Sequence, residues 1–267
     1  MPDYKELALK LHEKYRGKVA IASKVPLNNK DDLSTAYTPG VAEPCLHISK
    51  NKQDVYKYTS KGNMVAVITD GSAVLGLGNI GPEAALPVME GKAVLFKRFA
   101  GLDAFPICIN SQDTEEIIKT VKLIEPVFGG INLEDISSPR CFEIEERLKK
   151  ELSIPVMHDD QHGTAIVVLA GLINSCKVSG KQIKNVKITI CGAGAAGIAV
   201  TKLLLKYGIK DIIMADSKGI INQKREDLNK EKKEISKITN SNNLSGSLAD
   251  AVKQRDVFIG LSSKNLL

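Results

Sequence analysis

The chain has 267 residues, 43% of them hydrophobic, which is enough to bury the core of one large domain or of two ordinary ones. Its net charge of +6 comes from basic residues interleaved with acids, and aromatic residues make up only 4%, so nucleic acid is a poor candidate partner. A small anionic substrate suits the same charge balance.

Targeting signals and disulfide patterns are not evident. Near Met1 there is no charged start followed by a short apolar run, and no uninterrupted apolar stretch reaches the ~18 residues that span a bilayer. We therefore expect a cytoplasmic protein without a membrane partner. The cysteines include no C-x-x-C pair and fit reduced thiols better than a disulfide framework or a zinc clip; they are Cys45, Cys108, Cys141, Cys176 and Cys191.

The first half of the chain predicts a mostly parallel sheet. Residues 3–16 carry leucines among charges and predict a moderately amphipathic helix, whereas the prolines and the glycine in residues 24–45 predict a loop. Short β-branched runs then alternate with helical patterns, which is typical of parallel sheets. The predicted strands are 64–71, 93–101, 104–110, 127–132 and 154–159, and the predicted helices are 115–124 and 141–152.

The second half begins with an apolar helix and a glycine-rich turn. Residues 164–180 are apolar on nearly every side and predict a buried helix that leads into a second unit. A strand at 186–191 then meets GAGAAG, a helix follows through Leu205, and the next strand, 211–216, ends on Asp216. The predicted elements that remain are a solvated helix face with a loop (222–243), and a helix with a third strand (247–262).

The glycine-rich unit predicts a dinucleotide site. Gly192 allows the tight turn, Gly194 lets a pyrophosphate approach the backbone, and Gly197 lets the helix pack on the strand. The motif alone also occurs as a turn in other α/β folds, but here the strand, the helix and the acidic strand end are all present. Asp216 would accept hydrogen bonds from the adenosine ribose and repel a 2′-phosphate. NAD is therefore favoured over NADP, although Lys218 nearby moderates that preference.

Two acidic pairs follow predicted strands. In HDDQHGTA (158–165), Asp159 and Asp160 stand at the carboxyl end of a strand, where open α/β sheets bind ligands. Glu134 and Asp135 follow VFGGIN in a comparable position, although an acidic cap on the next helix explains this pair equally well. A cluster of carboxylate oxygens suits Mg²⁺ or Mn²⁺, whereas zinc prefers histidine and thiolate.

Several motifs in order resemble the small prokaryotic type of malic enzyme. They are YTPGVAEPC (37–45), the segment 67–101, INLEDISSPRCFEIE (131–145), HDDQHGTA and GAGAAG, and the resemblance covers roughly residues 15–262. It implies an N-terminal α/β malic-enzyme domain (1–163) followed by a Rossmann-like NAD-binding domain (164–267). The implied reaction is metal-dependent oxidative decarboxylation of L-malate to pyruvate and CO2, with reduction of NAD or NADP.

The resemblance also implies roles for individual residues. Tyr37 would be the general acid, Lys92 the general base, and Asp159 a carboxylate beside the metal or the lysine. The metal ligands would be Glu134, Asp135 and Asp160. The cofactor-binding residues would be Gly192, Ala193, Gly194, Ala195, Ala196, Gly197, Asp216 and Ser217.

Several of these residues have simpler explanations. Tyr37 ahead of Thr-Pro-Gly can pack a turn, and Lys92 can be a solvated lysine at a strand start. The family gives no metal role to His158 and His162, so they are expected to hydrogen-bond around the site.

The segment after the first predicted strand departs from a nucleotide-binding pattern. GLGNIG (76–81) resembles a second glycine fingerprint, but Pro82 and Pro87 interrupt the helix expected after it, so we interpret it as a substrate-side loop. Ala73 stands where the larger eukaryotic branch has an arginine for the substrate carboxylate, so recognition of that carboxylate must come from elsewhere.

The Rossmann-like domain is expected to be incomplete. Family members continue well past a strand like VFIGLS with a segment that supplies asparagines to the substrate and the nicotinamide. The principal hypothesis is an NAD-dependent malic enzyme, as a homodimer whose N-terminal segment completes the partner's active site. A catalytically weak nucleotide-binding or regulatory fragment is the alternative, and a shikimate or methylene-tetrahydrofolate dehydrogenase shares the two-domain plan without needing three metal carboxylates.

Overall fold

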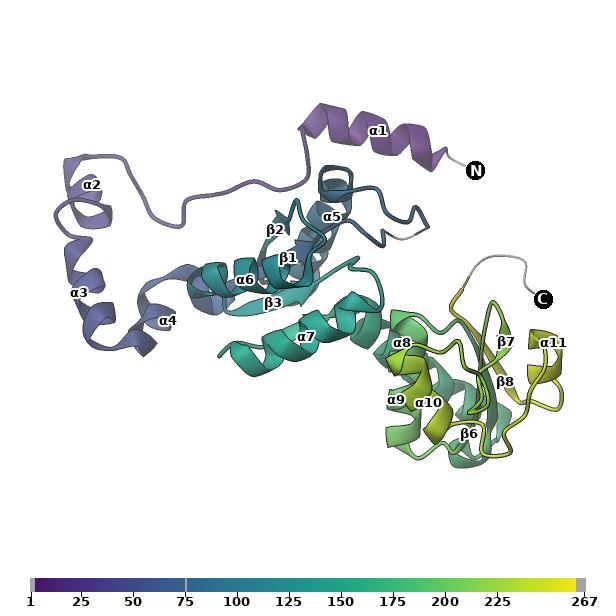
Figure 1. The fold of residues 1–267 in the computed structure, drawn as a ribbon. Helices are drawn as coiled ribbons and strands as arrows, with labels where there is room; N and C mark the ends of the chain where they lie inside the picture. Colours follow the sequence, from purple (N-terminus) through teal and green to yellow (C-terminus); the bar gives the residue numbers. More distant parts are fainter. Residues whose placement is uncertain (1–2, 75, 263–267) are drawn as a thin grey trace. The chain divides into compact units, whose positions relative to one another are not determined.

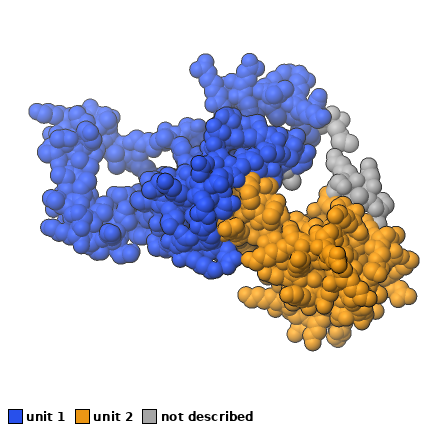
Figure 2. Space-filling view, in the orientation of Figure 1, with its two compact units in different colours: residues 1–135, 146–156 blue, residues 136–145, 157–267 orange. Residues whose placement is uncertain are grey.

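The computed structural model describes residues 3–74 and 76–262, which form two compact units (Figures 1 and 2). Unit 1 comprises Met1–Asp135 and Glu146–Val156, and unit 2 comprises Ile136–Glu145 and Met157–Leu267. The boundary predicted between residues 163 and 164 falls inside helix α8 (Asp159–Ser179), the whole of which belongs to unit 2.

The first sheet has four strands in the order β2-β1-β3-β4. The central strand β1 (Met64–Thr69) pairs in parallel with β2 (Asp103–Cys108) and with β3 (Gly130–Leu133), and β4 (Val156–His158) lies beyond β3. Residues 66–68 of β1 are fully buried, as expected of a strand covered on both faces. Because β1 and β3 are parallel, their carboxyl ends share the edge at which such sheets bind ligands.

Among the described residues of this half, helices α1 to α6 of unit 1 and helix α7 accompany the sheet (Figure 1). The N-terminal helix α1 is present as predicted, but none of its residues is buried. The bounds are α1 Tyr4–Tyr15, α2 Lys30–Ala36, α3 Ala42–Lys50, α4 Val55–Tyr58, α5 Pro82–Ala100, α6 Thr114–Ile124 and α7 Arg140–Glu151, with 3-10 turns at Lys52–Asp54, Ser60–Asn63 and Glu125–Val127.

The loop predicted for residues 24–45 is wrong in part, because it contains α2 and the start of α3. The side chain of Asn29 accepts a hydrogen bond from the backbone N–H of Asp32 (2.9 Å) and so caps α2. Pro44 lies in the first turn of α3, where a backbone N–H would have no partner within the helix.

The strand predicted for residues 93–101 is also wrong, since the chain there is helical. Pro82 opens α5 at its first position, where proline is well tolerated, and Pro87 removes only one hydrogen bond of a 19-residue helix. Ala85, Met89 and Ala93 are buried four residues apart, so burial of one helical stripe prevails over the strand propensity of the local sequence. The prolines therefore do not interrupt the helix after GLGNIG.

The second sheet has the order β7-β6-β5-β8. Its central strand β5 (Lys187–Cys191) pairs in parallel with β6 (Asp211–Asp216) and β8 (Val257–Gly260), and β7 (Gly219–Ile220) is antiparallel to β6. The predicted strands of this half, including the third, are confirmed. The helices besides α8 are α9 Ala195–Tyr207, α10 Lys230–Ile238 and α11 Leu248–Ala251, with a 3-10 turn at Ile183–Asn185.

Helix α8 is less buried than predicted. One stripe, with Ala165, Leu172 and Cys176, joins the core of unit 2, whereas Val167 and Val178 are exposed. Among the described residues it is the one helix long and apolar enough to cross a bilayer, by length and composition alone. It begins at Asp159, so the HDDQHGTA segment forms its first turns and not a loop ahead of it.

Two helical glycines have opposite surroundings. A Cβ at Gly197, in the first turn of α9, would lie 1.9 Å from the carbonyl oxygen of Gly192, so the strand and the helix approach each other as only glycine allows. A Cβ at Gly171, in α8, would meet nothing within 4 Å.

Alanine at these two positions is expected to change stability in opposite directions. Gly197→Ala should lower the free energy of unfolding by roughly 2 kcal/mol or more through overpacking, whereas Gly171→Ala should raise it by up to about 1 kcal/mol through helix propensity. Urea unfolding followed by circular dichroism measures both. Equal stability of the two variants would contradict the close packing of α9 on β5.

Candidate functional site

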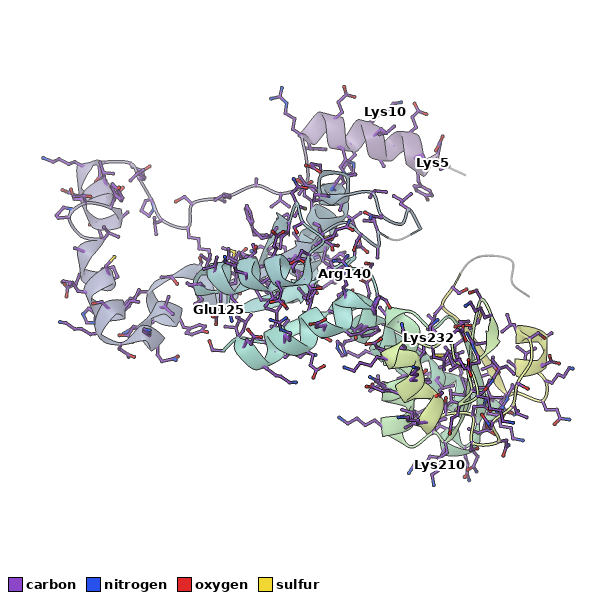
Figure 3. All side chains as sticks on the ribbon, in the orientation of Figure 1. Lys5, Lys10, Glu125, Arg140, Lys210 and Lys232 are labelled. Atoms are coloured by element: carbon purple, nitrogen blue, oxygen red, sulfur yellow. The ribbon has the colours of Figure 1, made fainter. Side chains whose placement is uncertain are left out.

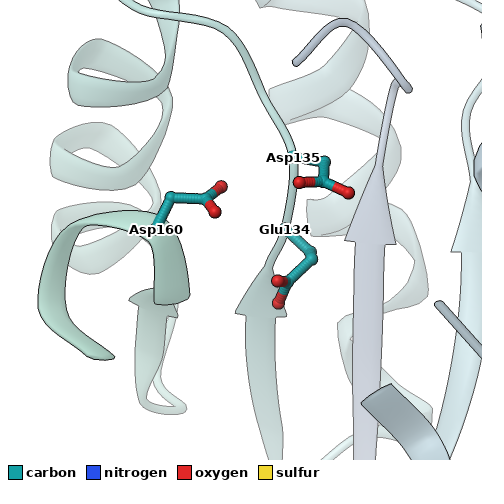
Figure 4. Close-up of side chains that lie close together, drawn as sticks. All are labelled: Glu134, Asp135 and Asp160. Carbon is teal, nitrogen blue, oxygen red and sulfur yellow. The ribbon is translucent and has the colours of Figure 1, made fainter. Parts of the chain in front are cut away.

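Three acidic side chains lie close together at the ends of neighbouring strands (Figure 4). Glu134 and Asp135 directly follow β3, and Asp160 is in the first turn of α8, directly after β4. One carboxylate oxygen from each lies within 4.8 Å of the others. This is the arrangement predicted from the position of both acidic pairs after strands.

The environment of this acidic cluster favours a cation. Glu134 and Asp135 are buried and Asp160 is partly buried, so their negative charges repel one another with little screening by water. Asp135 has a φ of 53°, a left-handed backbone conformation that is uncommon outside glycine and is found at functional sites. Three carboxylates offer only oxygen ligands, so the residues present fit Mg²⁺ or Mn²⁺ better than zinc.

Lys92 lies beside the acidic cluster. Its Nζ is 3.2 Å from Oε1 of Glu134, and its side chain is only 20% exposed. The amide of Asn132, also buried, donates to Oε2 of the same carboxylate (2.9 Å). Lys92 belongs to α5, so the alternative of a solvated lysine at a strand start is wrong.

The buried Glu145 of α7 contacts two histidines at the junction between β4 and α8. One of its oxygens accepts a hydrogen bond from the backbone N–H of His158 (3.0 Å), and Nε2 of His162 lies 2.8 and 3.0 Å from the two oxygens. His158 contacts Asp160 at 3.2 Å, without the geometry of a hydrogen bond. His158 therefore contacts the acidic cluster, whereas His162 contacts Glu145.

Glu145 was missed from the sequence. Its signal is present, because Glu145 shares the apolar face of α7 with Cys141, Ile144 and Leu148, all buried. A carboxylate at such a position needs polar partners in the folded protein.

Asp159 is held against its own helix. A Cβ at Gly163 would lie 2.4 Å from Oδ1 of Asp159, so the absence of a side chain at residue 163 makes room for that carboxylate. A position beside the lysine or a metal stays a prediction.

Among the described residues, no contact joins the side chain of Tyr37 to the acidic cluster. It ends α2, its backbone N–H donates to the carbonyl of Leu33, and its side chain is 66% exposed. The side chain therefore does not pack the turn, and in the described part of the chain no hydrogen bond of its hydroxyl is seen.

The glycine-rich turn has the shape expected of a phosphate-binding loop. Gly192 has a φ of +115°, and a Cβ there would lie 2.6 Å from the carbonyl oxygen of Leu261. Space around Gly194 is open, and no side chain caps α9 at this residue, so the N–H groups of Ala195 and Ala196 are not capped from Gly194. Ala193 between the two glycines is buried.

Asp216 ends β6 and already has four hydrogen-bond donors. Arg225 contacts both carboxylate oxygens (2.8 and 3.2 Å), and Lys232 (2.7 Å) and the backbone N–H of Lys218 (3.0 Å) complete the set, while Ser217 is exposed. Burial by itself raises the pKa of Asp216, but the hydrogen bonds from Arg225 and Lys232 outweigh burial and lower that pKa below its ordinary value. Asp216 is therefore part of an ion-pair group with Arg225 and Lys232, and its role toward the adenosine ribose stays a prediction.

Arg225 and Lys232 belong to the charged segment 222–243, for which the sequence predicts a solvated helix face and a loop. The segment does contain α10 and loops, but Leu228 and Ile235 are buried in the core of unit 2. The burial of these two residues is hard to recognise in the sequence, because the few apolar residues are spaced among many lysines and glutamates.

Two family models together match most of the chain. Residues 16–149 match the model described as malic enzyme, N-terminal domain, and residues 161–267 match the model described as malic enzyme, NAD binding domain. The matched segments contain Lys92, Glu134, Asp135 and the glycine-rich turn.

Proteins of similar sequence are also malic enzymes. A bifunctional malic/malolactic enzyme of Bacillus subtilis (strain 168) is 61% identical over 97% of this chain, and an NAD-dependent malic enzyme of Geobacillus stearothermophilus is 57% identical over 94%. The chain spans only 63% and 52% of the lengths of these curated relatives.

A solved structure also matches. The crystal structure of an NAD-dependent malic enzyme from Thermotoga maritima is 50% identical, with a TM-score of 0.94 over 97% of this chain and 70% of the other. With a fold of this likeness and both domain models matched, the chain belongs to the malic enzyme family.

Proposed function

We propose that the protein carrying this chain catalyses the oxidative decarboxylation of L-malate to pyruvate and CO2, with reduction of NAD and a requirement for Mg²⁺ or Mn²⁺. The observation that carries this proposal is the acidic cluster with Lys92 beside it. A base next to a cation site is what oxidation of a 2-hydroxy acid needs.

Glu134, Asp135 and Asp160 would hold the metal, and the turn from Gly192 to Gly197 would hold the pyrophosphate of the dinucleotide. A bound divalent cation would stabilise negative charge on the substrate oxygens as a Lewis acid, and the nicotinamide would accept the hydride from C2. Asn132 and Lys92 orient Glu134, while Glu145 and the two histidines support the turn that carries Asp160.

The proton transfers would be made by side chains of the chain itself. Nζ of Lys92 would accept the proton of the C2 hydroxyl, with Asp159 as a carboxylate close to the same groups. After loss of CO2, the hydroxyl of Tyr37 would donate a proton to C3, which yields pyruvate. The partly buried position of Lys92 excludes much of the water that would compete for these protons.

The exposure of Tyr37 supports a homodimer in which the N-terminal segment completes the partner's site. No residue of α1 or α2 is buried, and this segment exposes large apolar side chains such as Leu9, Ile21 and Leu27. Large apolar side chains exposed to solvent in one subunit are often covered at protein–protein interfaces.

Removal of the general base tests the reaction. Lys92→Ala should lower the rate of Mn²⁺-dependent NADH and pyruvate formation from L-malate by about 10²-fold or more, as expected for loss of an acid–base group. Lys97→Ala is the matched control, since Lys97 lies on the same helix but is exposed and pairs with Asp103. If the wild-type chain binds NAD and yields no pyruvate, a nucleotide-binding or regulatory fragment becomes the better description.

Metal binding can be measured without turnover. Asp160→Asn removes one carboxylate charge and should weaken Mn²⁺ binding, followed by electron paramagnetic resonance, by at least about tenfold. Glu146→Gln, in an exposed pair with Lys150 on α7, should leave the affinity unchanged. Equal Mn²⁺ affinity in the wild type and Asp160→Asn would contradict the assignment of Asp160 as a ligand.

Mixing two inactive variants tests the shared site. If Tyr37 serves the partner's Lys92, a 1:1 mixture of Tyr37→Phe and Lys92→Ala should form heterodimers with one intact site and recover about a quarter of the wild-type rate. Each variant alone should stay inactive at the same concentration. No recovery, in a mixture shown by sedimentation to exchange subunits, would place both residues in one protomer's site.

A further inference from the structure

The first buried residue of the described chain is a lysine. Among the described residues 3–60 none is buried, and this segment includes helices α1 to α4. Lys61, in the 3-10 turn Ser60–Asn63, is only 8% exposed. Lysine is almost never buried without polar partners that replace the water around its charge. The burial of Lys61, where the exposed segment meets the first sheet, therefore indicates a specific role.

The ammonium of Lys61 binds the backbone of the turn that precedes β3. Its Nζ donates hydrogen bonds to the carbonyl oxygens of Glu125 (2.8 Å) and Phe128 (2.6 Å), and it lies 5.6 Å from the centre of the Tyr56 ring. An ammonium has three hydrogens, so two carbonyls and one aromatic face account for its donors. The backbone is closely packed here as well, since a Cβ at Gly129 would lie 2.4 Å from the carbonyl oxygen of Lys61.

The turn that Lys61 binds is itself fixed to the first sheet. The carboxylate of Glu125, labelled in Figure 3, accepts hydrogen bonds from the hydroxyl (2.7 Å) and the backbone N–H (3.3 Å) of Ser153, which lies shortly before β4. The backbone N–H of Gly129 donates to the carbonyl of Met64, the first residue of β1 (2.8 Å). Lys61 therefore binds a turn that is held at the amino ends of two strands.

Helices α2, α3 and α4 with their 3-10 turns form a helical lobe, residues 30–63, that carries Tyr37 (Figure 1). Where α2 meets α3, the backbone N–H of Val41 donates to the carbonyl of Tyr37 (2.7 Å). Between α3 and α4, the rings of His47 and Tyr58 pack edge to face, with their centres 5.7 Å apart. The helices of the lobe thus contact one another in sequence.

Thr59 joins the lobe to Lys61. Its hydroxyl donates to the carbonyl of Val55 in α4 (2.6 Å) and accepts a hydrogen bond from the backbone N–H of Lys61 (3.2 Å). Tyr56 of the same helix supplies the ring beside the ammonium. A displacement of Lys61 is therefore passed to α4, α3 and α2 through contacts between neighbouring elements, all of which belong to unit 1.

We infer that Lys61 is a positioning residue that fixes the helical lobe, and with it Tyr37, relative to β3. The far end of this strand leads into Glu134 and Asp135, so the lobe is attached just ahead of the strand that carries two of the proposed metal ligands. An apolar side chain at residue 61 would fill the space but leave two carbonyls of the turn without their donor. The inference rests on the proposed function, in which Tyr37 donates a proton to C3, and Lys61 acts on that step only through Tyr37.

Exchange of the methyl protons of pyruvate isolates the step assigned to Tyr37. In D2O with Mn²⁺ and NADH but without CO2, removal and return of a C3 proton appear as loss of the methyl signal in proton NMR. Lys61→Met should slow this exchange by at least about tenfold, because a displacement on the order of 1 Å at a proton donor already has a large effect on rate. Its Mn²⁺ affinity, followed by electron paramagnetic resonance, should equal that of the wild type.

A double-mutant cycle separates positioning of Tyr37 from a merely structural role. If Lys61 acts through Tyr37, the double variant Tyr37→Phe/Lys61→Met should exchange the methyl protons no more slowly than Tyr37→Phe alone. Lys61→Arg restores a charged donor and should recover most of the rate that Lys61→Met loses. Additive losses in the double variant would overturn the inference.

Lys57→Met is the matched control. Lys57 is an exposed lysine of α4 whose Nζ lies 4.9 Å from the centre of the Tyr58 ring, and in the described part of the chain it donates to no backbone carbonyl. Its replacement should leave the exchange of pyruvate protons unchanged. A loss as large as that of Lys61→Met would show that the effect does not depend on the hydrogen bonds to the turn, and would contradict the assignment to Lys61.

Hydrogen exchange of the backbone tests the attachment without turnover. Lys61→Met should speed amide exchange in residues 55–64 and 125–130 by at least about tenfold, read by mass spectrometry, because the lobe and the turn can then open separately. Gly129→Ala should have the same effect without loss of a charge, since its Cβ would meet the carbonyl oxygen of Lys61. Unchanged amide exchange in these variants would contradict the attachment.

The outcomes distinguish this inference from the proposed function. A wild-type protein that forms no pyruvate from L-malate and exchanges no methyl protons of pyruvate overturns the proposed function. If the wild type does both and Lys61→Met does both equally fast, the inference alone is overturned.

Discussion

Repulsion among three carboxylates within 4.8 Å of one another is the constraint on which the candidate site depends. Two of them are buried, where water screens the repulsion between their charges only weakly. Lys92 lies beside Glu134, and a cluster of carboxylate oxygens suits a divalent cation. The ends of β3 and β4 therefore bring together three carboxylates that the proposed divalent cation would bind.

Polar contacts to buried groups support this arrangement. Asn132 holds one oxygen of Glu134, and Glu145 binds both the backbone of His158 and the ring of His162. Buried hydrogen bonds of this kind specify a single conformation, because a partner that is lost leaves a buried charge unsatisfied. The residues that would bind a cation thus depend on these neighbours for their positions.

At the end of β6, beside the strand that leads into the glycine-rich turn, the charges are balanced differently. Asp216 forms ion pairs with Arg225 and Lys232. The carboxylate from which the sequence predicts a preference for NAD is therefore part of a larger ion-pair group. A single acidic residue at the end of the second strand consequently says less about cofactor choice than the residues that neutralise it. The turn itself follows the expected pattern, because Gly197 packs against Gly192 within a distance that no side chain permits.

The sequence by itself determined most of the strand and helix order, the parallel sheets, the glycine-rich turn and the two acidic pairs that follow strands, and the family resemblance selected Glu134, Asp135 and Asp160 from those pairs. These depend on local signals: apolar runs bounded by turns, the spacing of glycines, and acids that directly follow strands. It failed at residues 93–101, where burial of Ala85, Met89 and Ala93 along α5 prevailed over local strand propensity. It also failed in part of residues 24–45, where Asn29 caps α2 and Pro44 fits the first turn of α3.

Only the tertiary structure decided which side chains meet. Lys92 is 42 residues before Glu134, and Arg225 is nine residues beyond Asp216, so neither contact follows from a local pattern. Glu145 could be recognised as a charge on an apolar face, but its partners at the start of α8 depend on how β4 follows α7. Local pattern specifies elements, whereas contacts between distant residues arise from the packing of those elements, and the chemistry of this protein resides in such contacts.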